Sequence, residues 1–310
     1  MKRIFMIITV LALLLSTCSC KSQMPETYKL GMGVLVNADD TKDGKVIISS
    51  TLAAVALDAD GKIKECKIDV LEASMVIDGG IVERGGTYKS KVEQGDAYGM
   101  KEASPIGREW YEQAEHFEKY AVGKTADEIA NIAEGDSDLA AGCTVDVSDF
   151  KKAVVKAAND SYAKSFTAEK PELRVGFYTD DSSSVSASND AIGLCALYST
   201  FTCAAVENGE IKAILFDQSE PSVTFSHEGE VTGVIYDGTK KEQGDTYGMQ
   251  EYSDEGLEWY EQAGNFEDYM AGRTVDSIDK LEIGADTVSG CTIDCSPFVR
   301  ALAASMKNEE

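Results

Sequence analysis

The sequence predicts an α+β protein that contains two tandem copies of one domain. Residues 93–129 and 242–278 align without a gap, and 23 of these 37 positions are identical. The offset of 149 residues is the length of a domain and far exceeds the 20–50 residues of solenoid repeats. Within each copy, strand patterns come first and helix patterns follow, without βαβ alternation. This order favours an antiparallel sheet with helices packed at one side.

Each copy begins with a segment that has the pattern of a β-hairpin. The paired strands are expected at residues 51–57 and 63–70 in the first copy and at 200–206 and 211–216 in the second. Asp60-Gly61 and Asn208-Gly209 lie between them, and these residue pairs tolerate the positive φ of tight turns. Further strands are expected at residues 74–77, 222–225 and 231–236.

The repeated segment leads into an amphipathic helix in each copy. Its apolar stripe is Trp110, Ala114, Phe117 and Ala121 in the first copy and Trp259, Ala263, Phe266 and Met270 in the second. Ser104 is expected to cap the first of these helices, with Pro105 at the first helical position. Gly123 and Gly272 fit left-handed helix ends. Thr125 begins a capping box for a short second helix.

The last helix of each copy, and the boundary between the copies, also have sequence signals. Ser148 and Ser296 are expected to cap the two terminal helices. The polar segment 161–172 has the composition of a linker, which places the boundary near residue 168. The two domains are therefore expected at residues 24–165 and 170–310.

The amino terminus has the pattern of an export signal. Two basic residues precede an apolar run at residues 4–15, which is too short to cross a bilayer as a helix. Residues 1–20 resemble a bacterial lipoprotein signal, in which a cysteine becomes the lipid-modified first residue. Cys18 has a leucine three residues before it, so it is the expected lipidation site, with Cys20 as the alternative. A plain signal peptide of a secreted protein is the other interpretation.

Charge and cysteine usage exclude several classes of function. The net charge of −25 falls to about −27 without the two basic residues of the signal, and nucleic-acid binding requires basic stripes that this chain lacks. Six cysteines follow the signal, and only Cys143 and Cys291 are at equivalent positions. With two histidines and no CxxC motif, the chain does not fit a zinc or copper centre. No catalytic triad can be placed in both copies.

A seven-residue segment before the terminal helix of each copy carries the candidate chemistry. The two segments read Asp286-Thr287-Val288-Ser289-Gly290-Cys291-Thr292 and Asp138-Leu139-Ala140-Ala141-Gly142-Cys143-Thr144. They resemble the flavinylation site of the FMN-binding domain family, whose pattern is Asp, two variable residues, Ser or Thr, Gly, a small residue, then Thr or Ser. That family includes the C and G subunits of ion-pumping NADH-linked membrane complexes and exported flavin lipoproteins.

The resemblance implies that an FMN transferase joins the FMN phosphate to the last hydroxyl of the segment as a phosphoester. The implied cofactor-binding residues are Asp286, Ser289, Gly290 and Thr292 in the second copy and Asp138, Gly142 and Thr144 in the first. Cys replaces the usual Ala in both segments, and Ala141 replaces Ser in the first, so the second segment is closer to the family pattern. The alternative is a loop before a capped helix, in which the threonine forms only local hydrogen bonds.

Two hypotheses about function follow. The first is a lipid-anchored, extracytoplasmic electron carrier, rather than an enzyme with its own substrate, that carries covalent FMN and meets a membrane or extracellular redox partner. The second is a redox-inactive surface lipoprotein of the same fold that binds a small ligand or a partner protein. Tyr98 and Tyr247, in the repeated Gly-Asp-x-Tyr-Gly-Met sequence, are expected to pack on the core; contact with a planar ligand is the alternative. The Trp-Tyr-Glu-Gln-Ala run is expected to be the core face of its helix.

Overall fold

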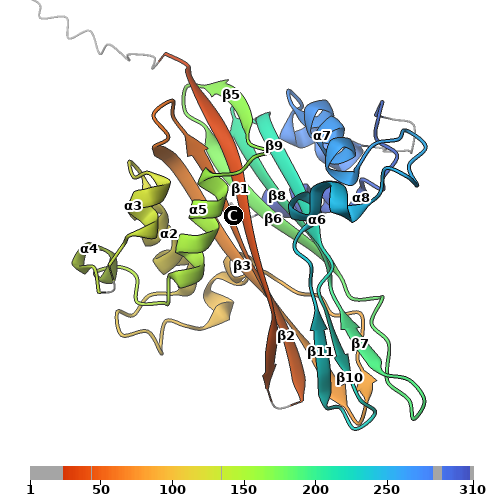
Figure 1. Cartoon of the computed structure of the whole chain (residues 1–310). Coiled ribbons are helices and arrows are strands. Elements are labelled where there is room, and N and C mark those ends of the chain that lie inside the picture. The colour runs from red at the N-terminus through yellow and green to blue at the C-terminus, as the bar shows by residue number, and fades with distance from the viewer. Residues whose placement is uncertain (1–23, 43, 134, 282–287, 308–310) are drawn as a thin grey trace, which may run out of the picture.

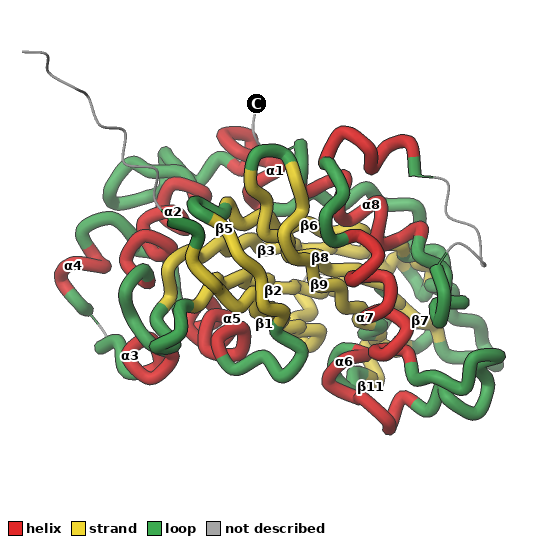
Figure 2. The backbone as a smooth tube through the Cα atoms, turned by 90° about the horizontal axis from the view of Figure 1, so that it is seen from above, coloured by secondary structure: helices red, strands yellow, loops and turns green. Residues whose placement is uncertain are grey.

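Curled antiparallel sheets form the middle of the molecule, and helices lie on both sides of them (Figures 1 and 2). This is a computed structural model, and it describes residues 24–42, 44–133, 135–281 and 288–307. The expected α+β class is confirmed. The expected lipidation residues Cys18 and Cys20 lie outside the described residues, as does Asp286.

The first sheet is antiparallel and has the strand order β4-β3-β2-β1-β5. Its strands are β1 (Glu26–Lys42), β2 (Lys45–Leu57), β3 (Ile63–Asp78), β4 (Ile81–Val82) and β5 (Lys164–Ala168). Residues 74–77 were expected as a separate strand but are the end of β3. The expected linker at 161–172 contains β5, because Phe166 and Ala168 are buried and the segment pairs with β1.

The second half contributes two three-stranded antiparallel sheets, with orders β6-β8-β9 and β11-β10-β7. The strands are β6 (Glu172–Asp180), β7 (Gly193–Ala196), β8 (Tyr198–Glu207), β9 (Glu210–Ser219), β10 (Ser222–Phe225) and β11 (Val231–Ile235). The expected hairpin between β8 and β9 is confirmed. Asn208 and Gly209 have φ values of 51° and 74°, as a tight turn between paired strands requires.

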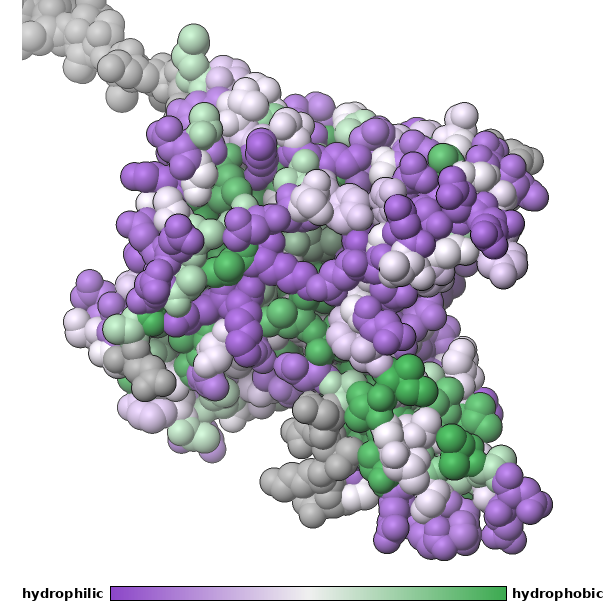
Figure 3. Space-filling model, viewed as in Figure 1, coloured by the Kyte–Doolittle hydropathy of each residue, from purple (hydrophilic) through white to green (hydrophobic). Residues whose placement is uncertain are grey.

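Apolar side chains gather on the surface over β10 and β11, at the end of the molecule opposite β5 (Figures 1 and 3). Val231, Val234 and Ile235 of β11 are 39–52% exposed. This end carries the β11-β10-β7 sheet, which has no counterpart in the first half among the described residues.

The helices occur in a similar order in the two halves. In the first half they are α1 (Lys91–Gln94), the 3₁₀ helix η1 (Gly95–Tyr98), α2 (Trp110–Ala121), α3 (Ala126–Ala130), α4 (Ser137–Ala140) and α5 (Ser148–Ala158). In the second half they are α6 (Lys240–Gln243), η2 (Gly244–Tyr247), α7 (Trp259–Met270), η3 (Val275–Lys280) and α8 (Ser296–Ser305). The predicted apolar stripes of α2 and α7 are buried, and Gly123 and Gly272 have positive φ, as expected.

The start of α2 was predicted wrongly. The helix begins at Trp110 and not at Pro105. The Glu109 carboxylate accepts hydrogen bonds from the N–H groups of Met100 and Lys101, at 2.9 and 3.0 Å, so it fixes the preceding turn beside the helix start. These bonds tie the chain around residue 100 to the start of the helix, and the segment between folds into turns.

The caps of the terminal helices also differ from the prediction. Ser148 and Ser296 are the first helical residues, and their N–H groups donate to the Asp146 and Asp294 carboxylates, each at 2.8 Å. An aspartate two residues earlier therefore has the role that was expected for serine. The capping box that begins at Thr125 is confirmed.

Apolar side chains form three cores. Two of them lie between a sheet and the helices of its own half. The third lies between the sheets and takes side chains from both halves, including Leu30, Ile48 and Leu71 from the first and Phe201 and Leu215 from the second. The two halves therefore share one core in addition to having one each.

Helix α5 packs closely on β1, and helix α8 packs closely on β6, in each case at a glycine of the strand. A Cβ atom on Gly33 would lie 2.0 Å from the Ala153 carbonyl oxygen, and one on Gly176 would lie 2.3 Å from that of Ala301. Only glycine permits this close backbone contact. The matched glycines therefore place β1 and β6 in the same close contact with the terminal helix of their own half.

Candidate functional site

The Gly-Cys-Thr loop of the first half is held against α2 by a buried glutamine. Thr144 donates two hydrogen bonds to Oε1 of Gln113, from its N–H at 2.8 Å and from its hydroxyl at 3.1 Å. The Gln113 side chain is fully buried, and its amide nitrogen donates to Ser104 Oγ at 3.2 Å. Both ends of the Gln113 amide are hydrogen-bonded. Because a buried amide with either end unpaired would be costly, these bonds hold the loop in one position against α2.

The second half repeats this clamp. Thr292 donates to Oε1 of Gln262 from its N–H at 2.8 Å and from its hydroxyl at 3.1 Å. Gln262 is fully buried and donates to Ser253 Oγ at 2.9 Å. The glutamine of the Trp-Tyr-Glu-Gln-Ala run therefore connects that run to the Gly-Cys-Thr loop. The sequence analysis missed this link, although both motifs recur together.

The loop of the second half has two exposed residues that carry hydroxyl groups. The Ser289 and Thr292 side chains are exposed, and Gly290 has a φ of 71°, which favours glycine. The Asn265 side chain on α7 donates to the Gly290 carbonyl oxygen at 2.8 Å. Ser289, Gly290 and Thr292 therefore lie together in one turn.

In the first half, His116 on α2 takes the position that Asn265 has on α7. A Cβ atom on Gly142 would lie 2.2 Å from Nδ1 of His116, so the imidazole packs directly on the loop. Nε2 of His116 lies 2.9 Å from the carbonyl oxygen of Asp138. Asp138 is exposed at the start of α4, and Thr144 is exposed at the end of the segment. His116 thus supports the loop locally.

The cysteines at the small-residue position of each motif lie beneath the loop. Cys143 and Cys291 are each 4% exposed, and all six cysteines in the described part of the chain are buried and reduced. Burial raises the pKa of Cys143 to about 11, so its sulfur is an uncharged thiol at neutral pH. Sγ of Cys291 lies 3.4 Å from Sγ of Cys295. The cysteines fill space that the small residue of the family pattern would fill.

A cavity of about 460 Å³ lies beside Thr144. Its apolar walls come from Ile132, Leu139, Val145 and Val147. Lys151 also lines it, and the Lys151 ammonium donates to the Ile132 carbonyl oxygen at 2.8 Å. Asp136, Asp146 and Ser148 also line the cavity, so its apolar part could contact a planar ring, while the two carboxylates oppose the attraction of Lys151 for an anionic phosphate.

The helix that follows each loop offers few free N–H groups to a phosphate. The N–H groups of Ser148 and Ser296 already donate to aspartate side chains. The N–H of Thr292 is taken by Gln262. The carboxylates of Asp146 and Asp294 add negative charge at these helix starts, which weakens their attraction for a phosphate.

The tyrosines of the Gly-Asp-x-Tyr-Gly-Met sequence cover a buried lysine. Nζ of Lys91 lies 5.1 Å from the centre of the Tyr98 ring and forms an ion pair with Glu72 at 2.8 Å. Nζ of Lys240 lies 4.9 Å from the Tyr247 ring and pairs with Glu220 at 2.8 Å. This cation–π contact is a structural role that the sequence analysis did not consider. The equal spacing of lysine and tyrosine in the two copies could have indicated it.

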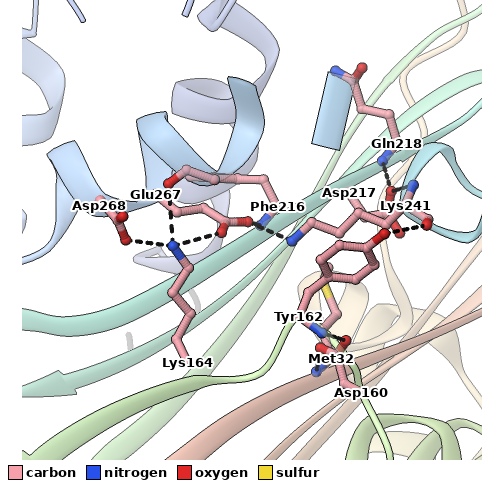
Figure 4. A network of polar contacts seen from close by, with 11 residues as sticks. Met32, Asp160, Tyr162, Lys164, Phe216, Asp217, Gln218, Lys241, Glu267 and Asp268 are labelled. Carbon is pink, nitrogen blue, oxygen red and sulfur yellow. Dashed lines mark hydrogen bonds and ion pairs between the residues drawn. The ribbon is translucent and has the colours of Figure 1, made fainter. Parts of the chain in front are cut away.

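Two buried aspartates at equivalent positions were also missed. Asp69 Oδ1 accepts hydrogen bonds from the N–H groups of Val70 and Val92, at 2.7 and 3.1 Å, and Asp217 makes the same pair of bonds in the second half. Burial raises the pKa of Asp69 to about 7 and that of Asp217 to about 6. The hydroxyl of Ser90 and the backbone N–H groups oppose the rise at Asp69, and Lys241, Thr239 and the backbone N–H groups oppose it at Asp217 (Figure 4). Perturbed carboxyl groups of this kind mark candidate functional sites.

The described residues contain no helix that is both long and apolar enough to span a membrane. Within the same residues, no group of three or more His, Cys, Asp or Glu side chains is arranged to hold a metal ion.

Comparisons with known proteins give one relative. No family model matches the chain, and no solved structure matches it. A chlorophenol reductase from Desulfitobacterium hafniense is 34% identical over 125 residues, which cover 34% of this chain and 38% of the relative. The chain therefore matches less than half of the length of that relative.

Proposed function

We propose that this protein is a lipid-anchored, extracytoplasmic electron carrier with two FMN-binding-like domains and FMN attached to Thr292 and Thr144. The observation that carries the proposal is the pair of matched loops, in which an exposed threonine is held at the same place by a buried glutamine. The name of the partial relative, a reductase, is consistent with redox chemistry. The lipid anchor belongs on Cys18 or Cys20.

The residues of the chain would position the cofactor. FMN would supply one- and two-electron transfer when bound. Gln113 on α2 and Gln262 on α7 hold the two loop threonines in place, which gives an FMN transferase a defined hydroxyl. The apolar residues beside Thr144 would exclude water from a bound ring system. Lys151 would place a positive charge at the same cavity, which Asp136 and Asp146 also line.

The two sites are supported by different observations. The second segment is closer to the family pattern, because Ser289 is present where the first segment has Ala141. The first segment has the adjoining cavity of about 460 Å³. We therefore propose flavin at both sites, with electrons supplied and removed by a membrane or extracellular redox partner.

A redox-inactive lipoprotein of the same fold is the second candidate. It is favoured by the hydrogen bond from each threonine hydroxyl to its glutamine, because that bond gives the threonine a structural role that needs no flavin. Such a protein would bind a small ligand or a partner protein.

Mass spectrometry after coexpression with an FMN transferase separates the two candidates. We expect FMN mass on peptides that span residues 281–300 and 131–152. Thr292→Ala should remove the flavin from the first peptide only, and Thr292→Ser should retain it as the matched control. If both peptides are unmodified while the transferase modifies a control substrate, the electron-carrier proposal is wrong and the second candidate stands.

A further inference from the structure

The second half contains two cysteines whose sulfur atoms are in contact. Cys291 lies in the Gly-Cys-Thr loop, and Cys295 directly precedes the first residue of α8. Their Sγ atoms are 3.4 Å apart, and the two residues are 4% and 3% exposed. A disulfide holds its sulfurs about 2.0 Å apart, so a small movement brings this pair to bonding distance. Among the six cysteines that the structure describes, no other two have their sulfurs in such contact.

Hydrogen-bonded backbone carries both cysteines. The N–H of Cys291 donates to the Val288 carbonyl oxygen at 3.1 Å, which closes the turn of the loop. The N–H of Val299 donates to the Cys295 carbonyl oxygen, also at 3.1 Å, which ties Cys295 to the first turn of α8. The short distance between the sulfurs is therefore a consequence of how the loop meets the helix.

The first half has the same backbone with only one of the two thiols. Cys143 is the counterpart of Cys291, and Val147 takes the place of Cys295 at the same spacing of four residues. Val147 has a φ of −98° and a ψ of 8°, and Cys295 has a φ of −89° and a ψ of 0°. In each half the next residue donates its N–H to an aspartate at 2.8 Å. The first half is therefore a matched control that lies within the same chain.

We propose that Cys291 and Cys295 are a disulfide-forming pair, oxidised by the disulfide of a thiol oxidant, and that the bond closes a ring around Thr292. The ring fixes the loop that presents the Thr292 side chain. Disulfides form and persist in oxidising compartments outside the cytoplasm. The inference rests on the proposed function only for the compartment that supplies the oxidant. Because the bond forms without flavin, its test and that of the proposed function can fail separately.

The reaction is thiol–disulfide exchange in two steps. The Cys291 thiolate attacks one sulfur of the oxidant, which forms a mixed disulfide and releases the first thiolate of the oxidant. Cys295 then loses its proton and attacks Sγ of Cys291, which forms the bond between them and releases the second thiolate. The two protein thiols thus lose two electrons and two protons, and the oxidant gains them and becomes two thiols.

The surroundings of the pair favour Cys291 as the first nucleophile. The hydrogen bond from Cys295 lowers the pKa of Cys291 against the effect of burial, and the same contact, together with burial, raises the pKa of Cys295. Sγ of Cys295 also lies 3.4 Å from the Ile293 carbonyl oxygen. Since both residues are buried in the folded chain, the oxidant meets them while the chain folds. They can meet at that stage, because only three residues separate them.

Refolding under oxidising conditions tests the bond. The intact chain is reduced, unfolded in urea and diluted into excess oxidised glutathione at pH 8; free thiols are then blocked with N-ethylmaleimide and the chain is digested with trypsin. Lys280 and Arg300 delimit the peptide 281–300, which holds both cysteines. We expect this peptide to be unlabelled and lighter by two hydrogen atoms than the reduced peptide. Peptide 125–151, which holds Cys143, should carry the label.

A label or a glutathione adduct on peptide 281–300, in a chain that has regained its native fluorescence, would overturn the proposal. If the chain does not refold, the folded chain is incubated with the same oxidant until labelling is constant. The same two results then decide the question.

Two substitutions connect the bond to the geometry. In the native chain, Tm should be about 3 °C higher after refolding in oxidised glutathione than in dithiothreitol, and Cys295→Ser should abolish this difference. Val147→Cys gives the first half the same pair, so peptide 125–151 should then lose its label. Equal Tm of the native chain under the two conditions would show that the bond does not hold the loop. Labelling of both cysteines in Val147→Cys would contradict the geometric argument.

Discussion

Replacing Asp69 by asparagine should stabilise the protein at neutral and alkaline pH. Asparagine keeps the side-chain oxygen that accepts the N–H groups of Val70 and Val92, at 2.7 and 3.1 Å in the native protein. It cannot ionise, so it removes the cost of a buried negative charge. The change thus tests whether Asp69 is a destabilising group that the fold retains.

The size of the effect follows from the pKa of the carboxyl group. Burial raises this pKa from 3.8 to about 7, and one pKa unit corresponds to about 1.4 kcal/mol. Because the folded pKa is raised, the proton bound to Asp69 stabilises the folded state fully below about pH 4. This stabilisation is lost as the pH rises through about 7. Relative to Asp69→Asn, the native chain should lose roughly 4 kcal/mol between pH 4 and pH 8.

Urea unfolding at pH 4, 6 and 8 measures this difference. Tryptophan fluorescence is a suitable signal, because Trp110 and Trp259 are buried in the two helix-facing cores. Asp217→Asn is the matched comparison. Its gain at pH 8 should be smaller, since Lys241 favours the ionised form of Asp217 and holds its pKa at about 6. A native chain and an Asp69→Asn chain whose stabilities differ by the same amount at all three pH values would refute the reasoning.

Three further predictions concern the loops and the halves. Thr292→Ala should remove FMN from peptide 281–300 yet cost only about 1 kcal/mol of stability, because the N–H bond to Gln262 remains; mass spectrometry and urea midpoints check both. Gln262→Leu should cost about 2 kcal/mol, since it leaves the Thr292 N–H unpaired, and should lower flavin loading; loading equal to the native chain would contradict it. Residues 24–168 expressed alone should associate or remain unfolded, because they expose the core shared between the sheets; a folded monomer in sedimentation would show that each half is self-sufficient.

Local patterns in the sequence predicted the hairpins and the longer helices, but not β1, β5, β6 or β7. The hairpins, the buried stripes of α2 and α7 and their glycine ends could all be predicted, because each depends on residues that are near one another in the chain. The repeated motifs also identified the two Gly-Cys-Thr loops as equivalent. The starts of the helices were predicted less well. At two of these starts, the carboxylates of Asp146 and Glu109 accept hydrogen bonds from backbone N–H groups. Several residue types could accept such bonds, so the sequence does not single out these two.

Only the tertiary structure decided what lies between the two halves. The alternation of apolar residues shows that each sheet has a buried face, but not which surface covers it, so the core shared by Leu30 and Phe201 was not predictable. The same limit applies to the segment 161–172. Its polar composition is typical of a linker, yet Lys164 satisfies a buried glutamate more than 100 residues away. Charge pairing over such a distance leaves no periodic signal, because it depends on how the sheets meet and not on the spacing of residues along the chain.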